Sequence, residues 1–147
     1  MVTVRHLLMV KGNQVWTMSP DSTMLEVLRT LSEKNIGALL IMDGKQIAGI
    51  ISERDIVRIV AKTGQCELDA PVKNHMTKGV YGVQIDQSIS ECMVLMTEKH
   101  IRHLPVLDRG QLVGLISIGD VVRQVISEHE TTIQDLENYI LNRGYGR

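Results

Sequence analysis

The chain has 147 residues, 44% of them hydrophobic, and a formal net charge of −1 at pH 7. Acidic and basic residues are nearly equal in number, and the chain has no Phe and one Trp. It therefore lacks the excess of basic residues and the aromatic side chains that nucleic-acid-binding proteins use, so we expect no nucleic-acid partner. No apolar run reaches membrane-spanning length and the N-terminus has no signal-peptide pattern. We therefore expect a cytoplasmic chain with no membrane partner.

The first predicted elements are two helices separated by an extended stretch. Val4, Leu7 and Leu8 predict a short helix within residues 1–13, and residues 14–19 are extended. The stripe of the second helix consists of Met24, Val27, Leu28 and Leu31. Asp21 or Ser22 is the candidate residue to cap its start.

A hairpin and a third helix follow. Residues 37–42 and 46–51 predict two strands, and Gly44 permits the turn between them. Ser52 then begins a helix, whose apolar residues are Ile56, Val57 and Val60.

The same order of elements returns 65 residues later. Residues 36–60 and 101–125 align without a gap and are identical at eleven positions. The second copy predicts an extended stretch at 80–85, a helix carrying Ile89, Cys92, Met93 and Met96, strands at 103–107 and 112–116, and a helix from Ser117. Because one copy is too small to bury a stable core alone, we expect the two to share one.

This repeat predicts the fold class and the organisation of the chain. The fold is α+β, with two tandem β-α-β-β-α motifs packed as a pseudo-two-fold pair and with flanking N- and C-terminal helices. The segments are an N-terminal lead-in at 1–13, a first motif at 14–70, a second motif at 71–127, and a C-terminal helix and tail at 128–147.

The C-terminal segment predicts a separate amphipathic helix. Thr132 and Asp135 resemble a capping box at its start. Its apolar stripe consists of Ile133, Leu136, Ile140 and Leu141. Two alternatives exist for burying this apolar face: it packs on the core of its own chain, or it packs on a second chain. The last residues are expected to fray.

Each copy places the pattern Ser-x-x-Asp directly after its last strand, as Ser52 with Asp55 and Ser117 with Asp120. Ser followed three residues later by an acid is typical of a helix start, where the two side chains cap the backbone. A helix start also binds anions, and a carboxylate beside it can accept both hydroxyls of a ribose. A strand glycine, Gly49 or Gly114, precedes each Ser and indicates a close backbone approach. The capping and the nucleotide-binding interpretations are compatible.

The segments "GIISERD" (49–55), "GLISIGD" (114–120) and "RHLPVLD" (102–108) resemble the paired CBS motifs of a Bateman module, and the resemblance covers residues 14–127. It implies a stand-alone regulatory module that binds AMP, ADP, ATP or NAD, and with less support S-adenosylmethionine, in clefts between the motifs. It also implies a homodimer that signals through conformational or dimer-interface change, with an unidentified protein partner possible. The alternative is a structural or interaction scaffold whose clefts are degenerate.

The resemblance also implies roles for particular residues. Ribose hydroxyls would bind Asp55 and Asp120, and Ser52 and Ser117 would contact phosphate or ribose. The adenine would be bordered by Thr17, Ala38, Val80 and His103. The phosphates would be surrounded by Arg54, Lys78, Arg102 and His103.

The two copies differ, so we expect two unequal sites. Arg54 has no charged counterpart in the second copy, and Arg102 and His103 stand where the first copy has Gly37 and Ala38. We expect no enzymatic activity, because no catalytic motif appears, and no metal, because the histidines lack ligand spacing. Trp16 is expected to fill the seam between the copies.

Overall fold

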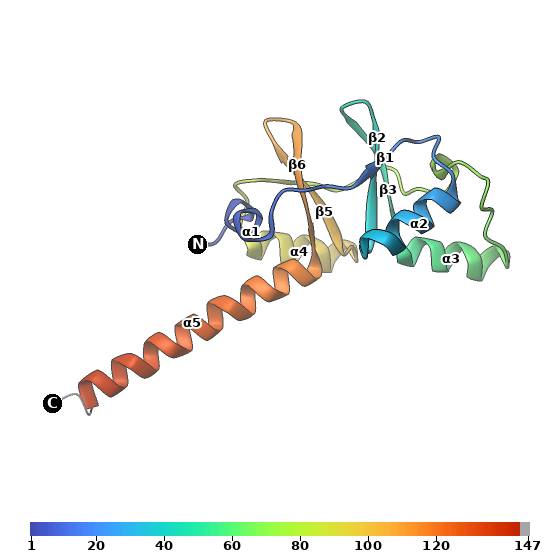
Figure 1. The fold of residues 1–147 in the computed structure, drawn as a ribbon. Coiled ribbons are helices and arrows are strands. Elements are labelled where there is room, and N and C mark those ends of the chain that lie inside the picture. Colours follow the sequence, from blue (N-terminus) through green and yellow to red (C-terminus); the bar gives the residue numbers. More distant parts are fainter. Residues whose placement is uncertain (145–147) are drawn as a thin grey trace.

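The computed structural model of the chain describes residues 1–144, with side chains described through residue 140. It contains two three-stranded sheets that lie next to each other (Figure 1). The first sheet consists of β1 (Thr17–Met18), β2 (Ala38–Asp43) and β3 (Gln46–Ser52), and the second of β4 (Val83–Gln84), β5 (His103–Asp108) and β6 (Gln111–Ser117). In each sheet the first two strands are parallel and the last two antiparallel. The predicted fold class, with two tandem motifs, is confirmed.

Two helices flank the strands of each motif. The helices are α1 (Val4–Lys11), α2 (Met24–Lys34), α3 (Glu53–Thr63), α4 (Ile89–Lys99) and α5 (Ile118–Gly144), with a 3-10 turn η1 (Val72–Asn74) between the motifs. The repeat includes the ends of the equivalent helices α2 and α4. Each of them ends at a residue with left-handed backbone, Asn35 and His100 respectively. None of the helices within the described residues is long and apolar enough to cross a membrane.

The start of α2 differs from the prediction. The N-cap is Thr23, whose hydroxyl accepts a hydrogen bond from Glu26 N at 3.2 Å, while the Glu26 carboxylate accepts one from Thr23 N at 3.1 Å. The prediction of Asp21 or Ser22 is therefore wrong, since only Thr23 has an acid three residues later to complete a capping box. Asp21 instead pairs with Lys73 at 2.9 Å.

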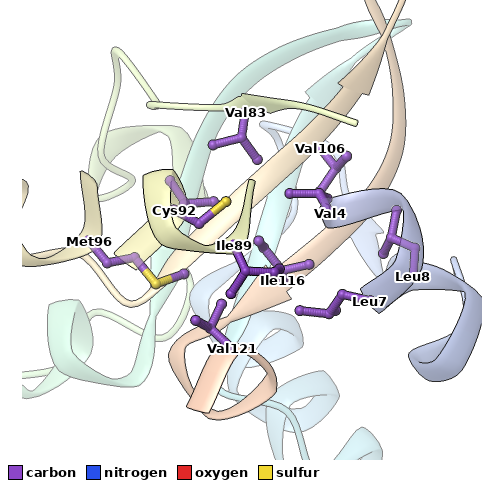
Figure 2. Close-up of a cluster of buried hydrophobic side chains, with 11 residues drawn as sticks. Val4, Leu7, Leu8, Val83, Ile89, Cys92, Met96, Val106, Ile116 and Val121 are labelled. Atoms are coloured by element: carbon purple, nitrogen blue, oxygen red, sulfur yellow. The ribbon is translucent and has the colours of Figure 1, made fainter. Parts of the chain in front are cut away.

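Each sheet has its own hydrophobic core, and each core takes side chains from a distant segment. Val4, Leu7 and Leu8 of α1 are buried in the core of the second motif, beside Ile116 and Val121 (Figure 2). The core of the first motif buries the side chain of Val72, which follows the first motif in the chain. The expectation of one core shared by both motifs is thus replaced by two cores joined by crossing segments.

The strand glycines make room for these segments. A Cβ at Gly114 would lie 2.8 Å from Leu8 Cδ2, and a Cβ at Gly49 would lie 2.8 Å from the carbonyl oxygen of Thr77. The predicted close backbone approach is confirmed at Gly49, where Thr77 lies, whereas the group that approaches Gly114 is the Leu8 side chain. The approaching groups belong to the chain itself, since Ile50 and Thr77 also exchange two backbone hydrogen bonds.

The helix α5 is one continuous element that extends away from both motifs (Figure 1). The predicted separate start at Thr132 is wrong, because its hydroxyl donates back to the Glu128 carbonyl at 3.0 Å and residues 120–143 contain neither Gly nor Pro. Ile133, Leu136 and Ile140 are more than half exposed, so this face does not fold back on its own core. The expectations for the Leu141 side chain and for residues 145–147 lie outside the described residues.

Candidate functional site

Both Ser-x-x-Asp patterns begin helices as capping residues. The backbone N–H of Ser52 donates to Asp55 Oδ2 at 2.9 Å, and the N–H of Asp55 donates to Ser52 Oγ at 3.3 Å. At the start of α5, Ser117 N donates to Asp120 Oδ2 at 2.8 Å and Asp120 N donates to Ser117 Oγ at 3.2 Å. The helix-start interpretation is confirmed for both copies.

A cavity of about 410 Å³, here cavity A, lies between the first motif and the start of α5. Asp120 and Ser117 line one side of it, and Ala38 lines the other. The rest of its lining is Lys11, Gly12, Gln14, Val15, Trp16, Asn35, Ile36, Gly37, His103 and Leu115. The carboxylate of the second copy therefore faces an opening whose opposite wall comes from the first copy.

A second cavity of about 490 Å³, here cavity B, lies at the start of α3. Ser52, Arg54 and Asp55 line it together with Arg102 and His103 from the second motif. The rest of its lining is Gly37, Ile50, Glu53, Arg58, Thr77, Lys99, His100, Ile101, Ser117 and Ile118. Four cationic side chains and two carboxylates share this lining, so its net charge is positive and suits an anionic ligand.

The two cavities share a wall formed by Gly37, His103 and Ser117. Gly37 lies against the imidazole, since a Cβ at this position would be 3.4 Å from His103 Nε2, which is close to an ordinary contact distance. Burial lowers the pKa of His103, and the positive charges of Lys11 and Arg102 add to this effect against Asp120 and Glu53. His103 is therefore neutral at pH 7 and borders both cavities.

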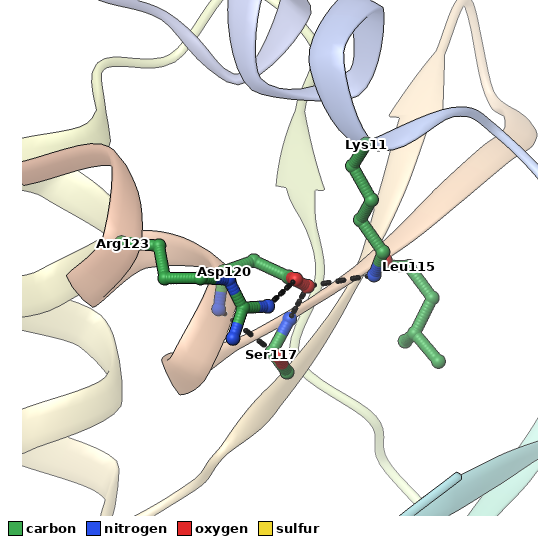
Figure 3. Close-up of polar contacts among 5 residues, drawn as sticks. All are labelled: Lys11, Leu115, Ser117, Asp120 and Arg123. Carbon is green, nitrogen blue, oxygen red and sulfur yellow. Dashed lines mark hydrogen bonds and ion pairs between the residues drawn. The ribbon is translucent and has the colours of Figure 1, made fainter. Parts of the chain in front are cut away.

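The Asp120 carboxylate is held by two cations (Figure 3). Its Oδ2 lies 2.6 Å from Lys11 Nζ, and its Oδ1 lies 2.8 Å from an Arg123 guanidinium nitrogen. The Asp120 side chain is only 8% exposed. Burial by itself would raise the pKa of Asp120, but the hydrogen bonds from Lys11 and Ser117 outweigh it and hold that pKa below its usual value. Asp120 is therefore ionised at neutral pH.

Three residues singled out from the sequence do not line either cavity: Thr17, Lys78 and Val80. Thr17 pairs with Leu40 in the first sheet, and its neighbour Trp16 lines cavity A instead. Thr77 lines cavity B, but the next residue, Lys78, is exposed and Gly79 follows it with a left-handed φ of 66°. The roles of these three residues in binding stay predictions.

The sequence analysis missed three cations that line the cavities, Lys11, Arg58 and Lys99. Arg58 lines cavity B, and its signal was the repeat itself, because Arg58 and Arg123 occupy the same position after each Asp. Lys11 had no comparable signal, since only the packing of α1 on the second motif brings it to Asp120.

Trp16 lines cavity A and packs against the first core, with Lys34 Nζ 4.3 Å from the centre of its ring. Lys99 lies 5.2 Å from the ring of Tyr81 at the equivalent places of the second copy. Among the described residues, no group of three or more His, Cys, Asp or Glu side chains is placed to hold a metal ion.

Comparison with known proteins agrees with this geometry. The family model of the CBS domain matches residues 2–62 and 72–127. The mitochondrial CBS domain-containing protein CBSX3 of Arabidopsis thaliana is 35% identical over 134 residues, which cover 88% of this chain and 65% of that protein. This chain thus spans just under two thirds of that relative's length.

Two solved structures extend the comparison. A CBS-domain containing protein from Agrobacterium tumefaciens is 40% identical with a TM-score of 0.80, covering 84% of this chain and 98% of that one. A CBS domain protein from Pyrobaculum aerophilum, solved in complex with AMP, is 26% identical with a TM-score of 0.72, covering 81% of this chain and 89% of that one. With its two matched motifs and its two similar sheets, the chain belongs to the CBS domain family as a tandem pair of CBS motifs.

Proposed function

We propose that this chain is a regulatory module that binds adenosine-containing nucleotides in cavities A and B and acts by binding rather than by turnover. The candidate ligands are AMP, ADP, ATP and NAD, with S-adenosylmethionine less favoured. The observation that carries the proposal is the position of each Ser-x-x-Asp carboxylate in the wall of a cavity that the other motif completes.

Cavity B supports the proposal with its charges. Asp55 Oδ2 accepts hydrogen bonds from Ser52, and its Oδ1 is the oxygen we assign to the ribose hydroxyls. Arg54, Arg58 and Arg102 line the same cavity and supply donors for phosphate oxygens. The volumes of both cavities lie in the range of about 300–1,000 Å³ that is typical of small-molecule sites.

Cavity A supports an adenine position without requiring aromatic stacking from Phe. Ala38 is buried at the start of β2, and Ile36 and Val15 line the same wall, so a planar base would meet aliphatic side chains there. The AMP complex of the Pyrobaculum aerophilum protein supports this class of ligand for a relative with the same fold.

We assign signalling to the relative packing of the two motifs. Each cavity is lined by both motifs, so a bound ligand contacts both and stabilises the arrangement that fits it better. The crossing segments are α1, which packs into the core of the second motif, and residues 66–77, which carry Val72 into the core of the first motif. Because each segment connects the two motifs, it can transmit such a change.

We further propose that the chain forms a homodimer through apolar helix faces that it leaves uncovered. On α3, Val57 is 67% exposed, and on α5 the exposed apolar residues include Ile126, Ile133, Leu136 and Ile140. The spacing of these α5 residues, with His129 between the first two, alternates between three and four, which is typical of a helix that pairs with a copy of itself.

Thermal melting with millimolar AMP, ATP, NAD and S-adenosylmethionine tests the proposed ligand class. We expect at least one of the first three to raise the melting temperature, because a ligand that binds only the folded chain stabilises it. Asp55→Ala should remove the shift from cavity B and Asp120→Ala the shift from cavity A. No shift with any of the four compounds would contradict the proposal and favour the scaffold alternative.

A further inference from the structure

The ribose position proposed for cavity A is already occupied by groups of the chain. Asp120 Oδ2 accepts from Lys11 Nζ at 2.6 Å and from Ser117 N at 2.8 Å, and Oδ1 accepts from Arg123 at 2.8 Å (Figure 3). A carboxylate offers about four acceptor positions, so these three donors leave about one. Two ribose hydroxyls can bind there only if a present donor leaves.

The equivalent carboxylate in cavity B accepts hydrogen bonds from two donors rather than three, and neither of the two is a cation. Asp55 Oδ2 accepts from the backbone N–H and the hydroxyl of Ser52, and among the described residues no ion pair joins Asp55 to a cation. Arg58 corresponds to Arg123 in the repeat, yet it lines cavity B rather than pairing with Asp55. Asp55 therefore has acceptor positions for both hydroxyls.

Of the two donors that can leave, Lys11 is the one inside cavity A. Its side chain is 33% exposed and lines the cavity, whereas the Arg123 side chain is 74% exposed and is not part of the lining. Lys11 also donates to the Leu115 carbonyl, and α1 is fixed on the second core through Val4, Leu7 and Leu8. Lys11 belongs to the N-terminal lead-in and not to the repeat, so the repeat places no equivalent lysine at Asp55.

We propose that Lys11 is an internal competitor for the ribose position of cavity A, so that cavity B fills first and cavity A fills only when Lys11 releases Asp120. This inference rests on the proposed function and assigns a regulatory role to one residue of that site. It predicts two binding steps of unequal affinity, with the weaker step set by the ion pair between Lys11 and Asp120.

Adenosine is the probe that isolates this competition, because it has a ribose but no phosphate that Lys11 could bind. The titration uses the full chain carrying Asp55→Ala, in which cavity A alone retains the carboxylate of its Ser-x-x-Asp pattern. Adding Lys11→Met should tighten adenosine binding by about five- to tenfold, since the ion pair no longer has to break. Lys73→Met is the matched control, because it removes a lysine ion pair at the exposed Asp21 and should leave the affinity unchanged.

An unchanged or weaker affinity in the Lys11→Met chain would overturn the inference, and so would an absence of adenosine binding to it. AMP titrated into the unaltered chain then separates the two claims: AMP binding shows that the proposed function survives, and no binding shows that both fail. If Lys11→Met melts below the titration temperature, Lys11→Gln replaces it and should shift the affinity in the same direction.

Discussion

At the scale of single residues, His103 lies in the wall between the two cavities, and its protonation state changes the stability of the fold. Burial lowers its pKa from the ordinary value of 6.5, so the folded chain takes up a proton there less readily than the unfolded chain. As the pH falls below 6.5, the unfolded chain binds a proton at His103 before the folded chain does. The contribution of His103 to the free energy of unfolding therefore decreases as the pH falls.

We expect His103→Gln to flatten the pH dependence of stability between about pH 7 and pH 5. Urea denaturation at several pH values measures this, with the unaltered chain as the control. The same pH dependence in His103→Gln as in the unaltered chain would show that the imidazole is not held neutral by its surroundings.

Asp55 and Asp120 illustrate how far the sequence reaches at this scale. Both were predictable as capping residues and as cavity-facing carboxylates, because strand, Ser and Asp recur in the same register. The cations around Asp120 were not predictable to the same extent. Arg123 lies one helical turn away and its ion pair is local, but Lys11 is 109 positions earlier and meets Asp120 only through tertiary packing.

At the scale of elements, the start of α2 offers a test of the capping box. Thr23→Ala removes the hydroxyl that accepts from Glu26 N and should lower the free energy of unfolding by about 1 kcal/mol. Chemical denaturation measures the loss.

Asp21→Ala is the matched control for this change. Asp21 lies two residues away and its ion pair with Lys73 is largely exposed, with side-chain exposures of 80% and 51%, so its loss should cost far less. A larger loss in Asp21→Ala than in Thr23→Ala would mean that the helix start is stabilised in another way.

The strands and helices of each motif were predictable because their apolar spacing and turn residues act locally. The length of α5 was not, because Thr132 and Asp135 have the composition of a helix start but lie within residues 120–143, which contain neither Gly nor Pro. The Thr131 and Thr132 hydroxyls donate hydrogen bonds to carbonyls of the preceding helical turn, so they do not cap a helix start. A capping pattern in the sequence is therefore not enough by itself to begin a new helix.

At the scale of the whole molecule, the crossing segments decide which parts of the chain form each core. A period of 65 residues predicted two similar motifs, but not that α1 completes the second core and Val72 the first. This arrangement is set by long-range packing, for which one sequence carries no periodic signal.

The uncovered face of α5 predicts how the molecule associates. Ile133→Asp combined with Leu136→Asp should convert the proposed homodimer to a monomer, because charges on this face oppose its burial. Sedimentation velocity measures the mass. Gln134→Asp with Asn138→Asp adds the same charge to polar positions and should leave the dimer intact. A dimer that persists in the first variant would place the interface elsewhere, for example on α3.

The central claim is that the cavity-facing carboxylates bind the ribose of an adenosine-containing nucleotide. A crystal structure of the chain grown with AMP tests it most directly. The account predicts AMP in cavity B with both ribose hydroxyls within hydrogen-bond distance of Asp55, and its phosphate near Arg54, Arg58 or Arg102. AMP bound outside both cavities, or both cavities without nucleotide at millimolar AMP, would contradict it.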